Sequence, residues 1–134
     1  MDLEIIKIAS NTENNKILEN HTHFSKMKNS ICGDEMQISI VIKNQKIVNF
    51  GYQCKSCIYC QASVSALSCN SLNQTVKSIK DLLSFADKFF INTKKKFPKN
   101  FIIFNKLFNK KNISRKECLL LPFKTLSKAL KDYD

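Results

Sequence analysis

The chain has 134 residues, of which 43% are hydrophobic and 25% charged. This balance is ordinary for a folded globular protein and excludes a disordered chain, and the length suits one domain with a single modest core. The formal net charge of +11 favours an acidic partner such as nucleic acid. However, Arg115 is the single arginine among 22 basic residues, and arginine is the better reader of bases and phosphates. Nucleic-acid binding is therefore the less favoured interpretation.

The expected cellular compartment decides how the six cysteines are interpreted. No run of about 18 uncharged apolar residues occurs, so no membrane span is expected. The start of the chain, Met1-Asp2-Leu3-Glu4, does not have the basic stretch and apolar block of a secretory signal. We therefore expect a cytoplasmic protein that does not associate with membranes. In a reducing cytosol, clustered cysteines indicate metal binding or sulfur chemistry rather than a disulfide scaffold.

The first half of the chain predicts a loose N-terminal segment followed by a hairpin. Residues 1–20 are weakly helical and poorly capped, so we expect them to be frayed or loosely helical. Residues 36–42 alternate, with isoleucines and Met36 on one face, as in a half-buried strand. Residues 43–46 are typical of a turn, and residues 47–52 are expected to form the returning strand.

The second half predicts helices. Small and apolar residues recur at helical spacing from 57 to 72, and residues 76–91 form a clear amphipathic pattern. A short helix is expected around 101–109, and a final helix over 119–133. Because proline is best tolerated in the first turn, Pro122 predicts that this last helix begins close behind Cys118. Strands followed by helices indicate an α+β fold with a small antiparallel sheet packed against helices.

Three cysteines fall at the predicted ends of elements. Cys32 precedes the hairpin, Cys57 lies where the second strand gives way to a helix, and Cys118 lies at the start of the last helix. Free amide groups and the dipole at a helix N-terminus favour thiolate over thiol, which is the form that binds metal or accepts sulfur. We therefore expect these three sulfurs to converge at strand and helix ends near the surface.

A tetrahedral ion needs a fourth ligand, and Asp34 is the candidate. Gly33 separates it from Cys32 and gives the backbone the freedom to turn both side chains toward one ion. Three sulfurs and one carboxylate oxygen suit Zn²⁺, with the carboxylate as the exchangeable member. The predicted metal ligands are therefore Cys32, Asp34, Cys57 and Cys118.

Three sequence blocks resemble the IscU/NifU-type iron–sulfur cluster assembly scaffold family, and most closely its SufU branch. They are Cys32-Gly33-Asp34 before an alternating strand, Cys57 before a small-residue helix containing Ala62-Ser63, and Arg115-x-x-Cys118 opening an apolar helix. The long interval between Cys57 and Cys118 is similar to that of the SufU branch, which carries an insertion there. The resemblance covers residues 20–134.

The resemblance implies a single NifU/IscU-like domain over residues 1–134, in which 93–114 is a variable insertion. It implies a scaffold for a labile [2Fe–2S] cluster, or a zinc-dependent sulfur acceptor supplied by a cysteine desulfurase. Cys118 would accept the sulfur, and Arg115 would stabilise its thiolate or persulfide. Cys32, Cys57 and Cys118 would hold the cluster. The recipients would be apo iron–sulfur proteins or downstream assembly factors, and the protein would be a non-enzymatic scaffold or a sulfurtransferase-like relay.

Two residues depart from the family pattern. Ser56 replaces the usual glycine before the middle cysteine, and Glu117 stands where IscU members have a histidine ligand. Segment 93–114 matches no family motif. These departures leave open whether the resident species is zinc or a cluster, and whether the activity has been kept or only the fold remains.

Other cysteines and histidines allow alternative interpretations. Cys54, Cys57 and Cys60 form a C-x-x-C-x-x-C run of the kind that ligates ferredoxin clusters, for which Cys69 would have to be the fourth ligand. We expect instead that Cys54 ends a strand and that Cys60 and Cys69 are small buried helix residues. His21 and His23 are expected to be solvated, although a histidine here could cover the metal site. A small basic nucleic-acid-binding module with a structural zinc is the alternative function, although the usual paired C-x-x-C spacing is missing.

Overall fold

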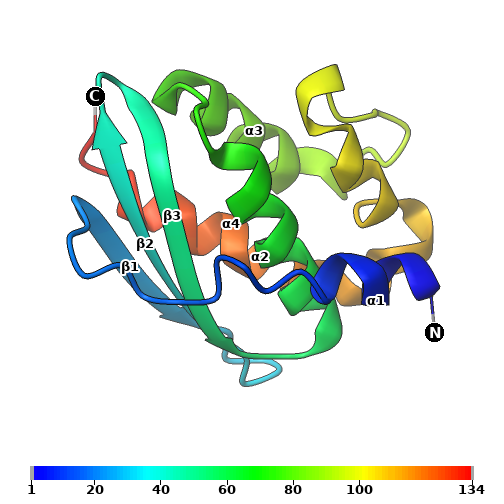
Figure 1. The fold of residues 1–134 in the computed structure, drawn as a ribbon. Coiled ribbons are helices and arrows are strands. Elements are labelled where there is room, and N and C mark those ends of the chain that lie inside the picture. The colour runs from blue at the N-terminus through cyan, green and yellow to red at the C-terminus, as the bar shows by residue number, and fades with distance from the viewer. Residues whose placement is uncertain (1, 134) are drawn as a thin grey trace.

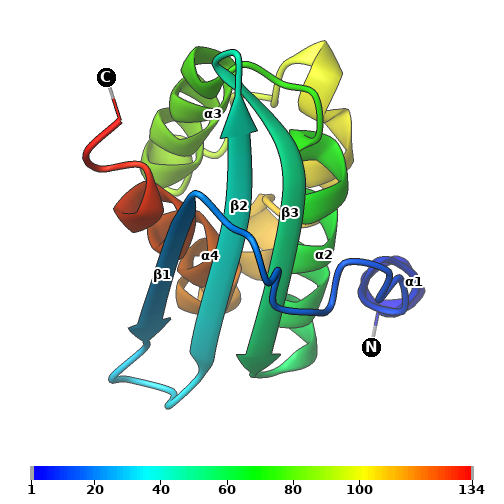
Figure 2. The same cartoon turned by 60° about the vertical axis from the view of Figure 1, so that its left-hand side comes forward.

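The computed structural model describes residues 2–133 and forms an α+β fold, as the sequence predicts (Figure 1). A three-stranded antiparallel sheet with strand order β1-β2-β3 carries helices α2, α3 and α4 on one face (Figure 2). None of the described helices combines the length and apolar character needed to cross a lipid bilayer. The elements run in the order α1 (Leu3–Ala9), β1 (His23–Lys28), β2 (Glu35–Lys43), β3 (Lys46–Lys55), α2 (Ile58–Ser71), α3 (Val76–Phe89), the 3₁₀ segments η1 (Lys99–Lys106) and η2 (Lys110–Arg115), and α4 (Lys116–Ala129).

The predicted hairpin is confirmed as β2 and β3. Asn44 and Gln45 connect the strands with φ angles of 51° and 65°, the left-handed pair of a type I′ turn, which matches the twist of the flanking strands. Met36, Ile38 and Ile40 are fully buried against the helices. The period-two pattern in the sequence therefore identified the core face of β2 correctly.

Strand β1 was not expected from the sequence. It pairs antiparallel with β2, with His23 opposite Ile40 and Lys28 opposite Glu35. Only Ser25 of its residues is buried, and its hydroxyl donates to the Thr125 carbonyl of α4. An edge strand this polar has no hydrophobic alternation, so tertiary pairing rather than local pattern makes it a strand.

The N-terminal segment is helical only over α1, where the Asp2 side chain caps the helix by accepting a hydrogen bond from the Glu4 amide (2.9 Å). Residues 10–22 then cross the face of the sheet opposite the helices (Figure 2). The Tyr52 amide donates to the Asn14 carbonyl (3.0 Å), and the Leu18 amide donates to the Ser39 hydroxyl (3.0 Å). This segment therefore covers Ser39, which is completely buried although it lies on the polar side of β2.

Helix α2 is buried on several sides because it packs against α1, α4 and β3. Its small residues allow this close packing: Ala62, Ser63 and Ala66 are all buried, and the Ser63 hydroxyl donates to the Leu119 carbonyl of α4 (2.7 Å). Helix α3 is amphipathic, as predicted, and is capped by Thr75, whose side chain accepts from the Ser78 amide (3.1 Å).

The region between α3 and α4 differs from the prediction. The expected helix over 101–109 is replaced by η1 and η2, and both are interrupted by non-helical backbone, at Phe101 and Asn112. Phenylalanine spacing suggested an α-helix, but the burial of rings toward several neighbours selects tighter, irregular turns. Phe101, Phe104 and Phe108 are buried, so they belong to the core as expected.

Helix α4 begins at Lys116, three residues earlier than predicted, so the limit inferred from Pro122 was wrong. Pro122 lies inside the helix and is buried. In an α-helix a proline at this position cannot bond to the carbonyl four residues earlier, which here belongs to Cys118. Tight packing of α4 against α2 and the sheet offsets this local cost.

Candidate metal site

The loop between β1 and β2 is shaped by Asn29 and Gly33. The Asn29 side-chain oxygen accepts from the amides of Ile31 (2.8 Å) and Cys32 (3.4 Å), which is the Asx geometry that asparagine favours. The Gly33 amide donates to the Asn29 carbonyl (2.8 Å), and Gly33 has φ of 79°. This left-handed residue turns the chain between Cys32 and Asp34, as the sequence suggested. Asn29 itself was not singled out, although asparagine before a glycine-containing loop is a turn signal.

Three of the four predicted ligands come together. One donor atom each from Cys32, Asp34 and Cys118 lies within 4.8 Å of the other two. Two sulfurs on one tetrahedral zinc would lie about 3.8 Å apart, given Zn–S bonds of about 2.3 Å. The three atoms are therefore close to coordination spacing. Cys32 is exposed, whereas Asp34 and Cys118 are buried, so the group faces solvent on the Cys32 side only.

Cys57 lies beside this group but is not part of it. It is the N-cap residue of α2, and its amide donates to Asp34 Oδ2 (3.4 Å). The pKa of the Cys118 thiol is raised, first by burial and then by the neighbouring Cys57 side chain and the charges of Cys32 and Asp34. Three thiols and a carboxylate in one place repel one another when ionised, and a bound cation relieves that repulsion. The donor set thus fits zinc or an iron–sulfur cluster.

Arg115 is placed close to this region through Tyr59. Its guanidinium carbon lies 5.1 Å from the centre of the Tyr59 ring, a cation–π geometry. Tyr59 follows Cys57 by two residues, so the cation lies near the N-terminus of α2. The adjacent Glu117 pairs with Lys124 (3.5 Å) and does not belong to the donor group.

The two histidines lie elsewhere. The His21 ring stacks on Phe24, with centroids 5.4 Å apart, and the His23 ring contacts the edge of Tyr133 at 6.0 Å. His23 is at the beginning of β1, whereas the Cys32 loop follows the end of that strand. A histidine covering the metal site was therefore the wrong alternative.

The remaining cysteines separate into two places. Cys69 lies near α1, where its sulfur accepts from Asn11 (3.5 Å) and donates to Glu13 (3.6 Å). It is therefore not the fourth ligand of a ferredoxin-like cluster, and it is half-buried rather than buried. Cys54 and Cys60 lie close to Asp34, Cys57 and Ser56, and burial raises the pKa of both thiols. None of the six cysteines forms a disulfide.

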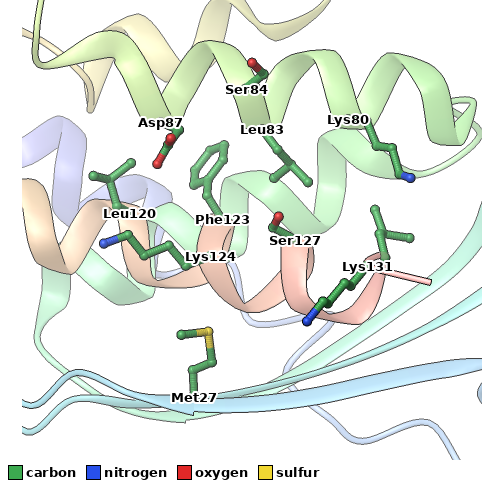
Figure 3. A pocket seen from close by; sticks show the side chains of 11 residues that line it. Met27, Lys80, Leu83, Ser84, Asp87, Leu120, Phe123, Lys124, Ser127 and Lys131 are labelled. Carbon is green, nitrogen blue, oxygen red and sulfur yellow. The ribbon is translucent and has the colours of Figure 1, made fainter. Parts of the chain in front are cut away.

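A separate cavity of about 520 Å³ runs between α3, α4 and the edge strand β1 (Figure 3). Its lining includes the apolar side chains of Leu83, Leu120 and Phe123 together with three lysines. It has Asp87 as its only carboxylate and is lined by no cysteine or histidine, so it offers poor metal ligands. The grouped metal-ligating side chains of the described residues therefore lie at the Cys118 end of α4 and not in this cavity.

Comparisons with known proteins agree with this architecture. Residues 2–87 match the NifU-like N terminal domain family. A Borreliella burgdorferi protein, described as uncharacterized, is 30% identical over 133 residues, which cover 97% of this chain and 89% of that protein.

Two solved structures are similar over almost the whole chain. The NifU-like N-terminal protein of Brucella abortus has a TM-score of 0.87 at 17% identity, covering 97% of this chain and 91% of its own, and shows likeness of fold alone. The putative iron–sulfur cluster assembly scaffold protein for the SUF system of Fervidobacterium islandicum has a TM-score of 0.85 at 26% identity. The match covers 97% of this chain and 96% of that protein's chain. The chain therefore belongs to the NifU-like N-terminal domain family, in agreement with the resemblance seen in its sequence blocks.

Proposed function

We propose that this protein serves iron–sulfur cluster assembly, either as a scaffold or as a zinc-dependent acceptor of sulfur from a cysteine desulfurase. The observation that carries the proposal is the grouping of Cys32, Asp34 and Cys118 donor atoms within 4.8 Å of one another. Membership of the NifU-like N-terminal domain family supports it, and so does the likeness to the Fervidobacterium scaffold protein.

The proposal gives each residue of the site a role. Cys32, Asp34, Cys57 and Cys118 hold zinc or a [2Fe–2S] cluster, which supplies Lewis acidity or is itself the cargo. Asp34 is the hard ligand and the one that exchanges most readily among sulfurs. Cys118 would accept the sulfur and would be the displaceable ligand of a bound metal. Arg115 supplies a cation near the N-terminus of α2, where it favours the ionised form of sulfur.

The solvent-exposed side of the site indicates where partner proteins would bind. Cys32 is exposed and lies on a surface loop, so a desulfurase delivering sulfur and an apo protein receiving a cluster would both approach there. We further propose that residues 1–134 form one NifU/IscU-like domain, in which 93–114 is a variable insertion; Met1 and Asp134 lie outside the described residues.

Metal analysis of protein purified without oxygen tests the site. We expect close to one zinc per chain, or a visible iron–sulfur absorption spectrum, and loss of either in C32S, D34A and C118S. Cys69→Ser is the matched control because Cys69 lies by α1, away from the donor group. Metal retained by the triple variant C32S/D34A/C118S would contradict the assignment.

Transfer of labelled sulfur from a cysteine desulfurase tests the function itself. The label is expected on Cys118 in the wild type and is expected to be absent from C118S, while C69S accepts it normally. If the folded wild-type protein takes no sulfur and no iron, the chain has kept the family fold without its chemistry.

A further inference from the structure

A second thiol pair stands next to the proposed metal site. Cys57 is the N-cap residue of α2, a helix of 14 residues, and Cys60 is the third residue of that helix. In the capping box, side chains at these two helix positions reach toward each other's backbone. Helix neighbours three residues apart have Cβ atoms roughly 5–6 Å apart, which is wider than the roughly 3.5–4.5 Å of a disulfide. Cys57 lies outside the regular helix, with φ of −72° and ψ of 169°, so a rotation of its backbone can bring the two sulfurs within bonding distance.

The surroundings of Cys60 leave it few reaction partners. Its side chain is 0% exposed, so small thiols and oxidants in solution cannot reach it. Cys57, three residues earlier at the N-cap of the same helix, is the thiol that the helix geometry brings next to it. The buried Ser56 hydroxyl lies beside it. Any chemistry of Cys60 is therefore intramolecular.

Cys57 connects this buried thiol to the sulfur-accepting position. Its amide donates to Asp34 Oδ2 (3.4 Å), and a carboxylate oxygen of Asp34 lies within 4.8 Å of the Cys118 sulfur, whereas Cys60 follows Cys57 by three residues in α2. It is also the one predicted ligand that stands outside the group formed by Cys32, Asp34 and Cys118. The thiols of Cys118, Cys57 and Cys60 therefore form a continuous series from the site into the core.

We propose that Cys57 and Cys60 form a dithiol that reduces the sulfur delivered to Cys118 and releases it as sulfide. This inference rests on the proposed function, because it takes Cys118 as the sulfur acceptor. It adds a source of two electrons inside the chain, so that the first sulfide needs no external reductant.

The reaction balances in two exchange steps. In the first, the Cys57 sulfur attacks the outer sulfur of the Cys118 persulfide; the S–S bond to Cys118 breaks, and Cys118 takes up the proton that Cys57 loses. In the second, the Cys60 sulfur attacks the Cys57 sulfur, a Cys57–Cys60 disulfide forms, and the outer sulfur leaves with the Cys60 proton as hydrogen sulfide. Two thiols are oxidised, and one persulfide sulfur is reduced.

The test uses the full chain, loaded with sodium polysulfide without oxygen, desalted, and left without added thiol. We expect wild type to release close to one sulfide per bound persulfide sulfur and to lose two hydrogens in intact mass. Peptide mapping should find the new disulfide between Cys57 and Cys60.

Cys60→Ala is the decisive variant. It is expected to keep the added sulfur atom and to release sulfide at no more than about one tenth of the wild-type rate. The reason is that the variant loses a neighbouring thiol whose effective concentration is very high. Cys60→Ser serves if the alanine variant fails to fold. Cys69→Ala, in the same helix but away from the site, is the matched control and should behave as wild type.

Equal sulfide release from wild type and the folded Cys60 variant would overturn the proposal, as would a disulfide linking Cys57 to Cys118 instead. A parallel experiment, in which a desulfurase loads the sulfur, distinguishes failure of the proposed function from failure of the dithiol reaction. If the desulfurase transfers no sulfur but polysulfide-loaded protein still forms the Cys57–Cys60 disulfide, the proposed function fails and the dithiol reaction stands.

Discussion

The two glycines of this chain serve different physical needs. Gly33 has φ of 79°, and a Cβ built on it would meet nothing within 4 Å, so only backbone conformation requires glycine there. Gly51 has no positive φ to explain it; a Cβ at that position would overlap the Lys16 carbonyl oxygen of the segment crossing the sheet. One glycine therefore shapes the metal loop, and the other allows close approach of the N-terminal segment.

Alanine substitutions at the two glycines should distinguish the conformational requirement from the requirement for close packing. Gly33→Ala is expected to cost about 1–2 kcal/mol of folding free energy through left-handed strain, and to weaken metal binding because Cys32 and Asp34 move. Gly51→Ala is expected to cost about 1–3 kcal/mol through overpacking, with metal binding unchanged in the folded protein. Urea unfolding and a zinc titration measure the two effects. Equal losses of metal affinity in both variants would contradict this division.

At the scale of elements, a cluster of phenylalanines joins the irregular segment η1 to α3 and α4. Phe108 is 1% exposed. Its ring centroid lies 5.1 Å from that of Phe97 and 5.1 Å from that of Phe123. Edge-on and stacked rings of this kind contribute beyond their buried area. The 3₁₀ segments, which have weak intrinsic stability, are therefore held by side-chain packing.

Truncation of one ring should show this dependence. Phe108→Ala is expected to lower the free energy of unfolding by about 3–5 kcal/mol, because it leaves a cavity among several rings. Ile102→Ala, in η1 but 64% exposed, should change it by no more than about 0.5 kcal/mol. Chemical denaturation followed by circular dichroism compares them. A small effect at Phe108 would mean that η1 and η2 are held by other contacts.

Across the whole molecule, positive charge is in excess and largely without ionic partners. Three ion pairs occur among residues 2–133, and all lie at the surface, with only the Asp2 side chain half-buried: Lys106–Glu4, Lys111–Asp2 and Lys124–Glu117. Most phenylalanine rings are in the core, so they cannot stack on bases. The surface therefore offers general attraction for polyanions without a structure that reads them.

Binding to a double-stranded oligonucleotide should follow from charge alone. We expect measurable affinity at low ionic strength, a linear fall of its logarithm with the logarithm of salt concentration, and no binding at about 0.15 M salt. Fluorescence anisotropy with duplexes of two unrelated sequences measures both dependence and specificity. Tight, sequence-dependent binding at physiological salt would restore the nucleic-acid module as the function.

Local sequence patterns predicted much of the fold. Alternation in residues 36–42 and the helical spacing of residues 76–91 identified β2 and α3, because each buries one face and its period shows in the sequence. Strand β1 could not be found, because an edge strand with one buried residue has no such period. Pro122 misplaced the start of α4, because packing overrode a local rule.

The sequence by itself determined the chemical types at the site: three cysteines at element ends, and an aspartate behind the glycine that turns its loop. Residue type and spacing within one loop are local properties, so they can be read from the chain. Only the tertiary structure decided that donor atoms of residues 32, 34 and 118 meet within 4.8 Å and that Cys57 stands beside them. Convergence of residues this far apart depends on how α2 and α4 pack against the sheet, and no local pattern encodes that distance.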